Sequence, residues 1–370
     1  MGAVGIICEY NPFHKGHLYH IEETKRLYPD KTIILVLNGY FLERGEVSIL
    51  TKENKTKLAL LYGVDLVVEL PFIFGTQSAD IFADAAITIL HYLECDTIVF
   101  GSESNDIELL QKIVDIQETY EYNQQVKKYL DEGVNYPTAM SKALGLDINI
   151  FKPNDLLGIS YIKTIKKHHY SITPITIKRT SNYHDLEAND EIISASNIRS
   201  KIKHGEDITY FVPKKVISAI ENISLSDFFP YIRYKILTDQ DLSRYLTVDE
   251  GIEFRLKEKI SDSTSLEEFI ESIKTKRYTY NKISRMLIHI LIGVPKEINK
   301  LASIEYIKIL GFNHEGRNYL HCLEDAQVSF VPIPNSLQYR YEMLASQIYQ
   351  LVSSRNILYF EKSNKPIYFE

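Results

Sequence analysis

The chain has 370 residues, of which 45% are hydrophobic and 25% are charged, and its formal net charge is -7. This length allows more than one domain with a packed core, and the acidic balance excludes a wholly basic protein that coats nucleic acid, while leaving room for a local basic surface. Three scattered cysteines without a CxxC pair argue against a zinc ribbon or a disulfide framework and fit a reducing cytoplasm. We expect neither a membrane-spanning segment nor a signal peptide, because no apolar run is long enough and the first residues lack a basic start.

The first 210 residues alternate between apolar runs and amphipathic segments. Helix signals include Thr51 and Ser78 as N-caps and Gly63 as a C-terminal stop. Strands that are apolar on both faces and separated by helices predict a parallel sheet covered on both sides, which is a doubly wound α/β fold with its ligands at the carboxyl ends of the strands. The predicted strands cover residues 3–9, 32–39, 64–71, 96–104 and 171–179, and the predicted helices cover about 14–27, 51–63 and 78–94, with a helical insertion before the last strand.

The predicted secondary structure changes after about residue 210. Helical patterns dominate, with strand signals only at 303–312 and 328–333. We therefore divide the chain into an α/β domain at 1–210 and a mainly helical domain at 211–370. The helices expected in the second domain lie at about 213–222, 228–247, 250–274 and 278–293.

The stretch "NPFHKGHLYH", residues 11–20, follows the first predicted strand. Pro12 stiffens the turn, so that a helix starts near His14 and places His14 and His17 one turn apart on the same face. Free N–H groups at a helix start favour an anion, and Gly16 allows a close approach to the backbone. Two imidazoles there suit a polyphosphate, where they would stabilise charge as the α-phosphorus is attacked. Surface histidines or a zinc site are the alternatives, and zinc is the less favoured because no third acid or thiol ligand clusters nearby.

A second phosphate motif is "ISASNIRS", residues 193–200, which comes after the last predicted strand of the first domain. It offers the hydroxyl groups of Ser194 and Ser196 and the guanidinium of Arg199 at a helix start, a combination that suits β- and γ-phosphates. An ordinary serine-capped helix is the alternative, and the pairing with the histidine motif favours the functional interpretation.

Together, "HKGH" and "ISASNIR" resemble the HxGH and ISxTxIR motifs of the nucleotidyltransferase superfamily, with Ser196 where threonine is usual. A wider set of strings resembles the tRNA(Met) cytidine acetate ligase family over both domains. Those strings are "GIICEYNPFHKGHLYHI", "NGYFLERGE", "DLVVELP", "FGSES", "KPNDLLGISYIK" and "KRYTYNKISRMLIH", with Glu43 where many members carry glutamine.

The resemblance implies a bacterial, cytoplasmic enzyme with a Rossmann-like nucleotidyltransferase domain. Members of the family use ATP as a co-substrate to activate acetate as acetyl-adenylate. They then transfer the acetyl group to N4 of the wobble cytidine of elongator tRNA(Met), which gives N4-acetylcytidine. The helical domain would bind the tRNA.

The resemblance also implies the site residues. His14 and His17 would act at the phosphates, and Gly101, Asn154 and Arg179 would complete the ATP site with Ser194, Ser196 and Arg199. From the residues alone, Asn154 could equally be a helix cap, and Arg179, where a strand leaves the sheet, fits a structural role as well as a functional one. The segment expected to wrap ATP consists of Ile7, Cys8, Glu9, Tyr10, Asn11, Pro12, Phe13, His14, Lys15, Gly16, His17, Leu18, Tyr19 and His20.

Two further sites are expected, one for acetate and one for RNA. Arg44, in a polar loop after the second strand, would place the acetate carboxylate. Basic residues interleaved with tyrosines suit an unpaired RNA strand, although a solvated helix face gives the same pattern. The basic stretches are residues 163–170 and the run that contains Lys274, Lys276, Arg277, Lys282 and Arg285.

Two other functions stay open at this point. An adenylyl- or cytidylyltransferase for a small phosphorylated acceptor would share both phosphate motifs but would not need a second basic domain. A non-catalytic nucleotide or RNA binder would not need both imidazoles. We expect no resident metal, and the sequence leaves open the Mg²⁺ requirement, the acyl-group selectivity and the oligomeric state.

Overall fold

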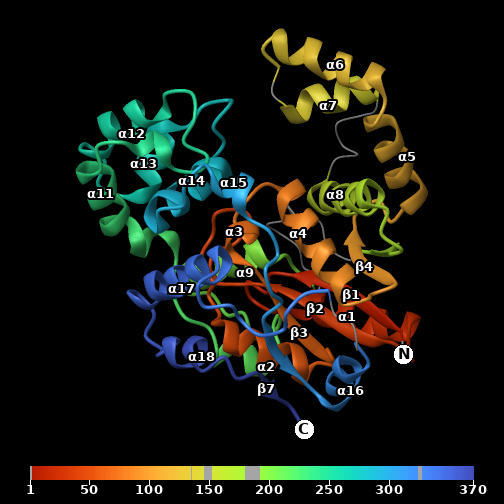
Figure 1. Ribbon diagram of the computed structural model, residues 1–370. Coiled ribbons are helices and arrows are strands. Elements are labelled where there is room, and N and C mark those ends of the chain that lie inside the picture. The colour runs from red at the N-terminus through yellow and green to blue at the C-terminus, as the bar shows by residue number, and fades with distance from the viewer. Residues whose placement is uncertain (1, 135, 146–151, 180–191, 324–326) are drawn as a thin grey trace.

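A seven-stranded sheet with the strand order β5-β4-β1-β2-β3-β6-β7 forms the centre of the protein (Figure 1). The computed structural model describes residues 2–134, 136–145, 152–179, 192–323 and 327–370. Strands β1 to β5 are mutually parallel, β6 runs antiparallel to β3, and β7 is parallel to β6. This arrangement confirms the predicted α/β fold. The strands are β1 (Ala3–Cys8), β2 (Thr32–Asn38), β3 (Leu66–Leu70), β4 (Thr97–Ser102), β5 (Thr173–Lys178), β6 (Ile309–Phe312) and β7 (Ile367–Tyr368).

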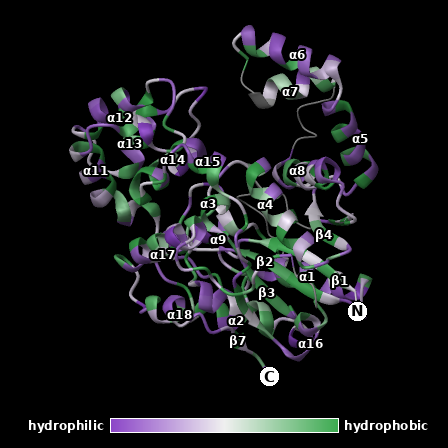
Figure 2. Ribbon diagram, viewed as in Figure 1, coloured by the Kyte–Doolittle hydropathy of each residue, from purple (hydrophilic) through white to green (hydrophobic). Residues whose placement is uncertain are grey.

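Helices cover both faces of the sheet, because alternate side chains of each buried strand point to opposite sides. In β2, Ile34 and Val36 join one hydrophobic cluster, whereas Leu35 joins the cluster on the other face. Figure 2 shows the resulting apolar strands between more polar helix surfaces. The first face carries α4 (Ala79–Tyr92), α8 (Pro153–His168) and α16 (His314–Cys322), and the second carries α1 (Lys15–Leu27), α2 (Lys52–Leu61), α9 (Ala195–Lys203) and α10 (Lys214–Ile217).

The strand order reverses between β1 and β4, since β2 and β3 extend the sheet on one side of β1 while β4 and β5 extend it on the other. In an open parallel sheet, such a switch point leaves a crevice beyond the carboxyl ends of the strands, where ligands bind. Helix α1 begins at this edge directly after β1, which places the 11–20 segment at the crevice.

A helical unit, which we define as α11 to α15, packs beside the sheet and shares a hydrophobic cluster with Phe41 and Phe72 (Figure 1). On the other side, α5 (Ile107–Gln117) packs against α8 and joins the hydrophobic cluster on the first face of the sheet, whereas α6 (Tyr120–Asp131) and α7 (Tyr136–Leu144) stand away from the sheet. The unit consists of α11 (Phe229–Thr238), α12 (Ile252–Ile260), α13 (Leu266–Ile273), α14 (Tyr280–Ile292) and α15 (Ile298–Leu301), with short 3-10 turns at Leu225–Phe228 and Leu242–Arg244. The remaining helices are α3 (Phe72–Gly75), α17 (Leu337–Gln350) and α18 (Leu358–Ser363).

Several predicted boundaries differ from the structure. The helix expected at 250–274 is split into α12 and α13 by the run "SDSTS" at 261–265, whose side chains compete for backbone hydrogen bonds. The strand expected at 328–333 is reduced to a single bridge between Ser329 and Tyr306, because Pro332 cannot donate to a ladder. The sheet also crosses the predicted division at residue 210, since β6 and β7 come from beyond it; the two-domain division itself stays a prediction. Over the described part of the chain, no helix is both long and apolar enough to cross a membrane.

Candidate active site

The two histidines of the first motif lie at the start of α1, where their rings are 4.0 Å apart. His14 is the N-cap, and its Nδ1 accepts a hydrogen bond of 2.9 Å from the backbone N–H of Gly16. The Nδ1 of His17 accepts in turn from the backbone N–H of His14, at 3.3 Å. The motif is therefore a capping box built from imidazoles, which fixes both rings at the exit of β1.

Both rings are neutral and present a donor. Burial, with Arg179 and Arg199 adding to it, lowers the pKa of His14 to about 3. Burial and the neighbouring His14 and His20 also hold the pKa of His17 well below its ordinary value. Because each Nδ1 accepts from the backbone, the proton of each neutral ring resides on Nε2. Two fixed Nε2–H donors beside two guanidinium groups suit the oxygens of a polyphosphate.

His20 has a different role within the predicted ATP segment. Its Nε2 lies 3.0 Å from the carbonyl oxygen of Val99 in β4, and its Nδ1 lies 4.0 Å from the Sγ of Cys8. Burial lowers the pKa of His20 to about 4, so this ring is neutral as well. The structure thus uses His20 to hold α1 against β4, and burial raises the pKa of Cys8 to about 12, which leaves a protonated, unreactive thiol.

Gly16 is required by the position of the His14 ring. A Cβ atom at Gly16 would lie 2.6 Å from Cε1 and 2.9 Å from Nδ1 of His14. Real side chains do not tolerate contacts this short, so any other residue at position 16 would displace the ring. The spacing of the HKGH motif therefore has a steric reason that can be read directly from the backbone.

The second motif lies against the first. Ser194 is the N-cap of α9; its Oγ accepts from the backbone N–H of Asn197 at 3.3 Å and lies 2.9 Å from the Oγ of Ser196. Arg199 donates from Nη1 to the backbone carbonyl of Asn11 at 2.6 Å and from Nη2 to Oε1 of Glu46 at 2.5 Å. Arg199 therefore ties the helix start of the second motif to the turn that carries the histidines.

The other predicted ATP residues gather at the exit of β4 around Glu103, which the sequence analysis missed. Asn154 donates from Nδ2 to Glu103 Oε1 at 2.6 Å, and Arg179 Nε lies 3.9 Å from the same oxygen. Gly101 makes room for Arg179, because a Cβ there would lie 3.3 Å from the Cγ of Arg179. The Nε of Arg179 is buried and has no hydrogen-bond partner among the described residues, so it is a donor available to a ligand.

Asp155 is a second missed residue at this edge. It is buried, and its carboxylate accepts from the hydroxyl of Ser102, the backbone N–H of Glu103 at 3.1 Å and that of Ser104 at 3.0 Å. Asp155 thereby joins the start of α8 to the loop that follows β4. An acidic residue just after a proline at a helix start was the available signal, since such residues favour the first turn.

Several residues of the 7–20 segment support the neighbouring loop rather than facing the crevice. Glu9 Oε1 accepts from the Nδ2 of Asn38 at 2.9 Å and from the backbone N–H of Glu43 at 2.8 Å. The buried Asn11 accepts from the backbone N–H of Ile49 at 2.9 Å. These contacts hold residues 39–50 against the exit of β1, while Tyr10 packs its ring 4.7 Å from that of His17. The expectation that the whole segment wraps ATP stays a prediction.

Arg44 is half-buried on the loop that these contacts hold. Burial is the main cause of the lowered pKa of Arg179, and the charge of Arg44 lowers it further. A cluster of Arg44, Arg179 and Arg199 with the two histidines makes this edge of the sheet strongly attractive to anions.

The two predicted basic stretches differ in their ion pairs and in the exposure of their side chains. Within 163–170, Lys166 pairs with Asp115 at 2.5 Å and Lys167 with Asp84 at 3.2 Å, so nearby carboxylates neutralise this stretch. At the start of α14, Lys276 is exposed, and Lys282 lies 4.1 Å from the centre of the Tyr278 ring. Lys274 pairs with Glu271 at 3.0 Å and Arg277 with Glu250 at 3.1 Å, both at the surface. Arg285 differs from the other four, because it turns inward against residues 43 and 77.

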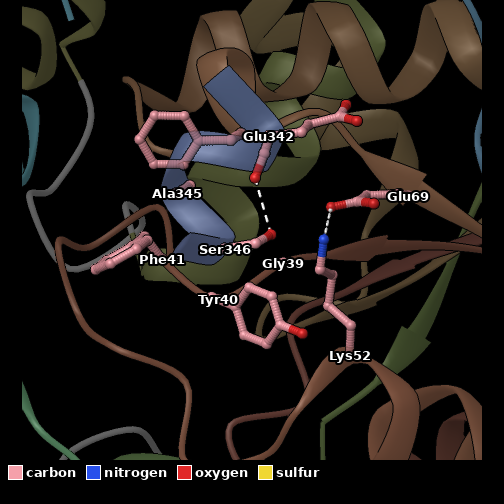
Figure 3. A pocket seen from close by; sticks show the side chains of 9 residues that line it. Gly39, Tyr40, Phe41, Lys52, Glu69, Glu342, Ala345 and Ser346 are labelled. Carbon is pink, nitrogen blue, oxygen red and sulfur yellow. Dashed lines mark hydrogen bonds and ion pairs between the residues drawn. The ribbon is translucent and has the colours of Figure 1, made fainter. Parts of the chain in front are cut away.

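A buried ionic cluster lies near the end of β2, beside a small cavity (Figure 3). Lys52 pairs with Glu69 at 2.7 Å and with Glu361 at 2.8 Å, and Lys308 pairs with Glu361 at 2.6 Å. The cluster joins α18 and β6 to α2 and β3, and it lies outside the crevice. No group of histidine, cysteine and acidic side chains among the described residues could hold a metal ion. The cavity is lined by Gly39, Tyr40, Phe41, Lys52, Glu69, Phe72, Glu342, Ala345 and Ser346.

The sheet is doubly wound, and two imidazoles that cap α1 lie at the exit of its first strand. The start of α9 places serine hydroxyls and an arginine beside them. Together these features define a nucleotidyltransferase of the HxGH class. The family model described as HIGH Nucleotidyl Transferase matches residues 1–364. A tRNA(Met) cytidine acetate ligase of Geobacillus sp. is 37% identical, with 99% of this chain and 100% of the relative aligned. One of Caldicellulosiruptor saccharolyticus is 39% identical over 100% of this chain and 99% of the relative.

Solved structures agree with these relatives. Thermotoga maritima TmcAL bound with alpha-thio ATP superposes with a TM-score of 0.84 at 28% identity and covers 100% of both chains. The apo form of the same protein gives a TM-score of 0.84 over 95% of this chain and 92% of that chain. The chain belongs to the tRNA(Met) cytidine acetate ligase family.

Proposed function

We propose that this enzyme activates acetate with ATP to acetyl-adenylate and then acetylates N4 of the wobble cytidine of elongator tRNA(Met). Membership of the ligase family supports an ATP-dependent ligase. The observation that carries the chemistry is the pair of neutral, backbone-fixed imidazoles, His14 and His17, at the crevice between β1 and β4.

In the first step, a carboxylate oxygen of acetate attacks the α-phosphorus of ATP. A bond forms between that oxygen and phosphorus, the bond from the α-phosphorus to the bridging oxygen breaks, and pyrophosphate leaves with the electron pair. The Nε2–H groups of His14 and His17 would donate to the oxygens on which charge grows, and the loss of one such donor typically costs about 100- to 1000-fold in rate. Acetate needs no base, since it is ionised at neutral pH.

The other residues divide between the two ends of the nucleotide. Ser194, Ser196 and Arg199 suit the β- and γ-phosphates, because they present hydroxyls and a guanidinium at the start of α9. Arg179, whose Nε has no partner in the part of the chain that the structure describes, and Asn154 would meet the nucleotide at the exit of β4. Arg44 is the candidate for the acetate carboxylate.

In the second step, N4 of cytidine attacks the acetyl carbonyl carbon. The carbon–nitrogen bond forms, the bond to the adenylate oxygen breaks, AMP leaves, and N4 loses one proton. A base inside an anticodon must be splayed out and held, and the exposed Lys276 and Tyr280, with the half-buried Lys282, suit that task at the start of α14.

The test is an incubation with ATP, labelled acetate and bacterial tRNA, followed by nucleoside mass spectrometry. N4-acetylcytidine should form with the wild type and fall about 100-fold with His17→Ala. His321→Ala is the matched control, because this exposed histidine lies on α16, remote from the crevice. ATP turnover without label in tRNA would refute the proposal and favour the transfer of a nucleotide to a small phosphorylated acceptor.

A further inference from the structure

Residues 41–47 form a tight hairpin between the two nucleotide motifs and the helical unit; we call it the 41–47 hairpin. A backbone bridge pairs Phe41 with Val47 in antiparallel fashion. The N–H of Leu42 donates to the carbonyl of Glu46 at 3.0 Å, and the N–H of Gly45 donates back to Leu42 at 2.9 Å. The tip, residues 43–45, is therefore a closed turn whose position depends on what holds it from outside.

One side of the hairpin is fixed to both nucleotide motifs. Glu9, just before the first motif, accepts from the backbone N–H of Glu43 at 2.8 Å, and Asn11 in the motif donates to the carbonyl of Val47 at 3.4 Å. Arg199 of the second motif pairs with Glu46. A displacement of the hairpin would therefore shift residues on each side of the crevice.

The other side is fixed to the helical unit by one guanidinium group. Arg285 Nη1, from the second turn of α14, donates to Glu43 Oε1 at 2.7 Å, to the backbone carbonyl of Glu43 at 3.2 Å and to the carbonyl of Gln77 at 2.9 Å. Burial raises the pKa of the Glu43 carboxyl, and Arg285 and Arg44 oppose that shift. Without Arg285, a half-buried carboxylate and two carbonyls would lose their donor.

The backbone of the hairpin touches the backbone of α14 at the same place. Gly45 has φ +75, and a Cβ atom there would lie 2.4 Å from the backbone nitrogen of Arg285 and 2.6 Å from the carbonyl carbon of Ser284. No other residue fits both the backbone conformation and the space. The contact between turn and helix is therefore specific in shape as well as in charge.

We propose that Arg285 is a positioning residue which, through its contacts with Glu43, sets the 41–47 hairpin from the helical unit and so places Arg44 for the acetate carboxylate. This inference rests on the proposed function, because it assigns a purpose to the same crevice. It also gives Arg285 a role distinct from that of Lys276, which lies exposed before the same helix.

The location of Arg285 makes the two halves of the reaction interdependent. Helix α14 starts directly after the basic run, so the helix that would meet the acceptor RNA also holds the loop that would meet acetate. A ligand that shifts α14 would change the affinity for acetate, and acetate would change the affinity for that ligand by the same factor.

The experiment is acetate-dependent exchange between ATP and labelled pyrophosphate, measured without tRNA. Arg285→Ala should raise the KM for acetate about tenfold and leave the KM for ATP within about twofold, since a misplaced binding group affects the substrate it holds. Glu43→Ala should give the same split, and the double variant should be no worse than either single one, because both remove one interaction. Glu43→Gln retains an acceptor oxygen and should restore most of the affinity.

Gly45→Ala tests the same contact with Arg285 intact and should also raise the KM for acetate. Lys300→Ala is the control, because this exposed lysine lies on α15 of the same helical unit and has no assigned role; its KM for acetate should match the wild type. Equal increases in the KM values for ATP and acetate with Arg285→Ala would overturn the positioning role, as would a defect confined to tRNA. A wild type without acetate-dependent exchange would instead overturn the proposed function and the positioning role with it.

Discussion

Replacing Gly16 by alanine should separate catalysis from stability. The new Cβ would lie 2.6 Å from Cε1 of His14, so the ring must leave its place and Nδ1 loses the N–H of residue 16. Without one phosphate donor, the rate of adenylate formation should fall about 100- to 1000-fold. This corresponds to about 3–4 kcal/mol in the activation barrier.

The stability of Gly16→Ala should change little. The loss of an N-cap bond costs about 0.5–2 kcal/mol. The exchange of glycine for alanine inside a helix returns about 1 kcal/mol. The free energy of unfolding in urea should therefore stay within about 1 kcal/mol of the wild type, as the difference of these two terms.

The matched control for Gly16→Ala is Thr119→Ala, which removes the cap of the remote helix α6, where Oγ1 accepts from the N–H of Tyr122 at 3.3 Å. This variant should lose about 1 kcal/mol of stability without any change in the rate of pyrophosphate exchange. If Gly16→Ala keeps an exchange rate within about twofold of the wild type, the fixed His14 ring is not the phosphate donor.

Three other outcomes are expected. The kcat/KM for ATP should stay flat between pH 7 and pH 5.5, because the pKa of His14 in the free enzyme is lowered to about 3; an inflection near the ordinary histidine value would contradict this. Asp155→Asn should lower the free energy of unfolding by about 1–3 kcal/mol in a urea titration, since it weakens the hydrogen bonds that hold the loop after β4. Burial opposes ionisation of Glu361, but Lys308 and Lys52 lower its pKa to about 2. The ionised Glu361 therefore contributes fully to stability above its unfolded pKa, and this contribution is lost as the pH falls through the folded pKa. Glu361→Gln should reduce that acid dependence and lower the free energy of unfolding by about 3–5 kcal/mol at pH 7, measured by thermal unfolding.

The sequence predicts the parallel sheet and the first motif well, because both depend on local signals. Apolar runs such as "TIILVLN" give β2 almost to the residue, and Pro12 with Gly16 marks the start of α1. Thr51 caps α2 as expected, whereas Ser78 starts α4 without a side-chain bond.

The parts that sequence could not supply depend on tertiary contacts. Glu103 and Asp155 exchange hydrogen bonds across about fifty positions of the chain, which no periodicity reports. Arg285 belongs to a basic run by composition, yet packing against Gly45 turns it inward. The joining of β6 to β3 is equally non-local, since the chain between them is largely helical.

That late pairing has a consequence for how the protein is made. β3 is complete at Leu70, but the strand that covers its outer edge begins at Ile309, and Lys308 is needed beside Glu69. At ribosomal speeds of about 5–20 residues per second, the edge of β3 stays uncovered for roughly 10–50 s of synthesis. An open apolar strand edge invites pairing with other chains. The nascent chain should therefore depend on chaperones during translation, and Lys52 and Glu69 could not form their full charge cluster until the last helix, α18, has emerged.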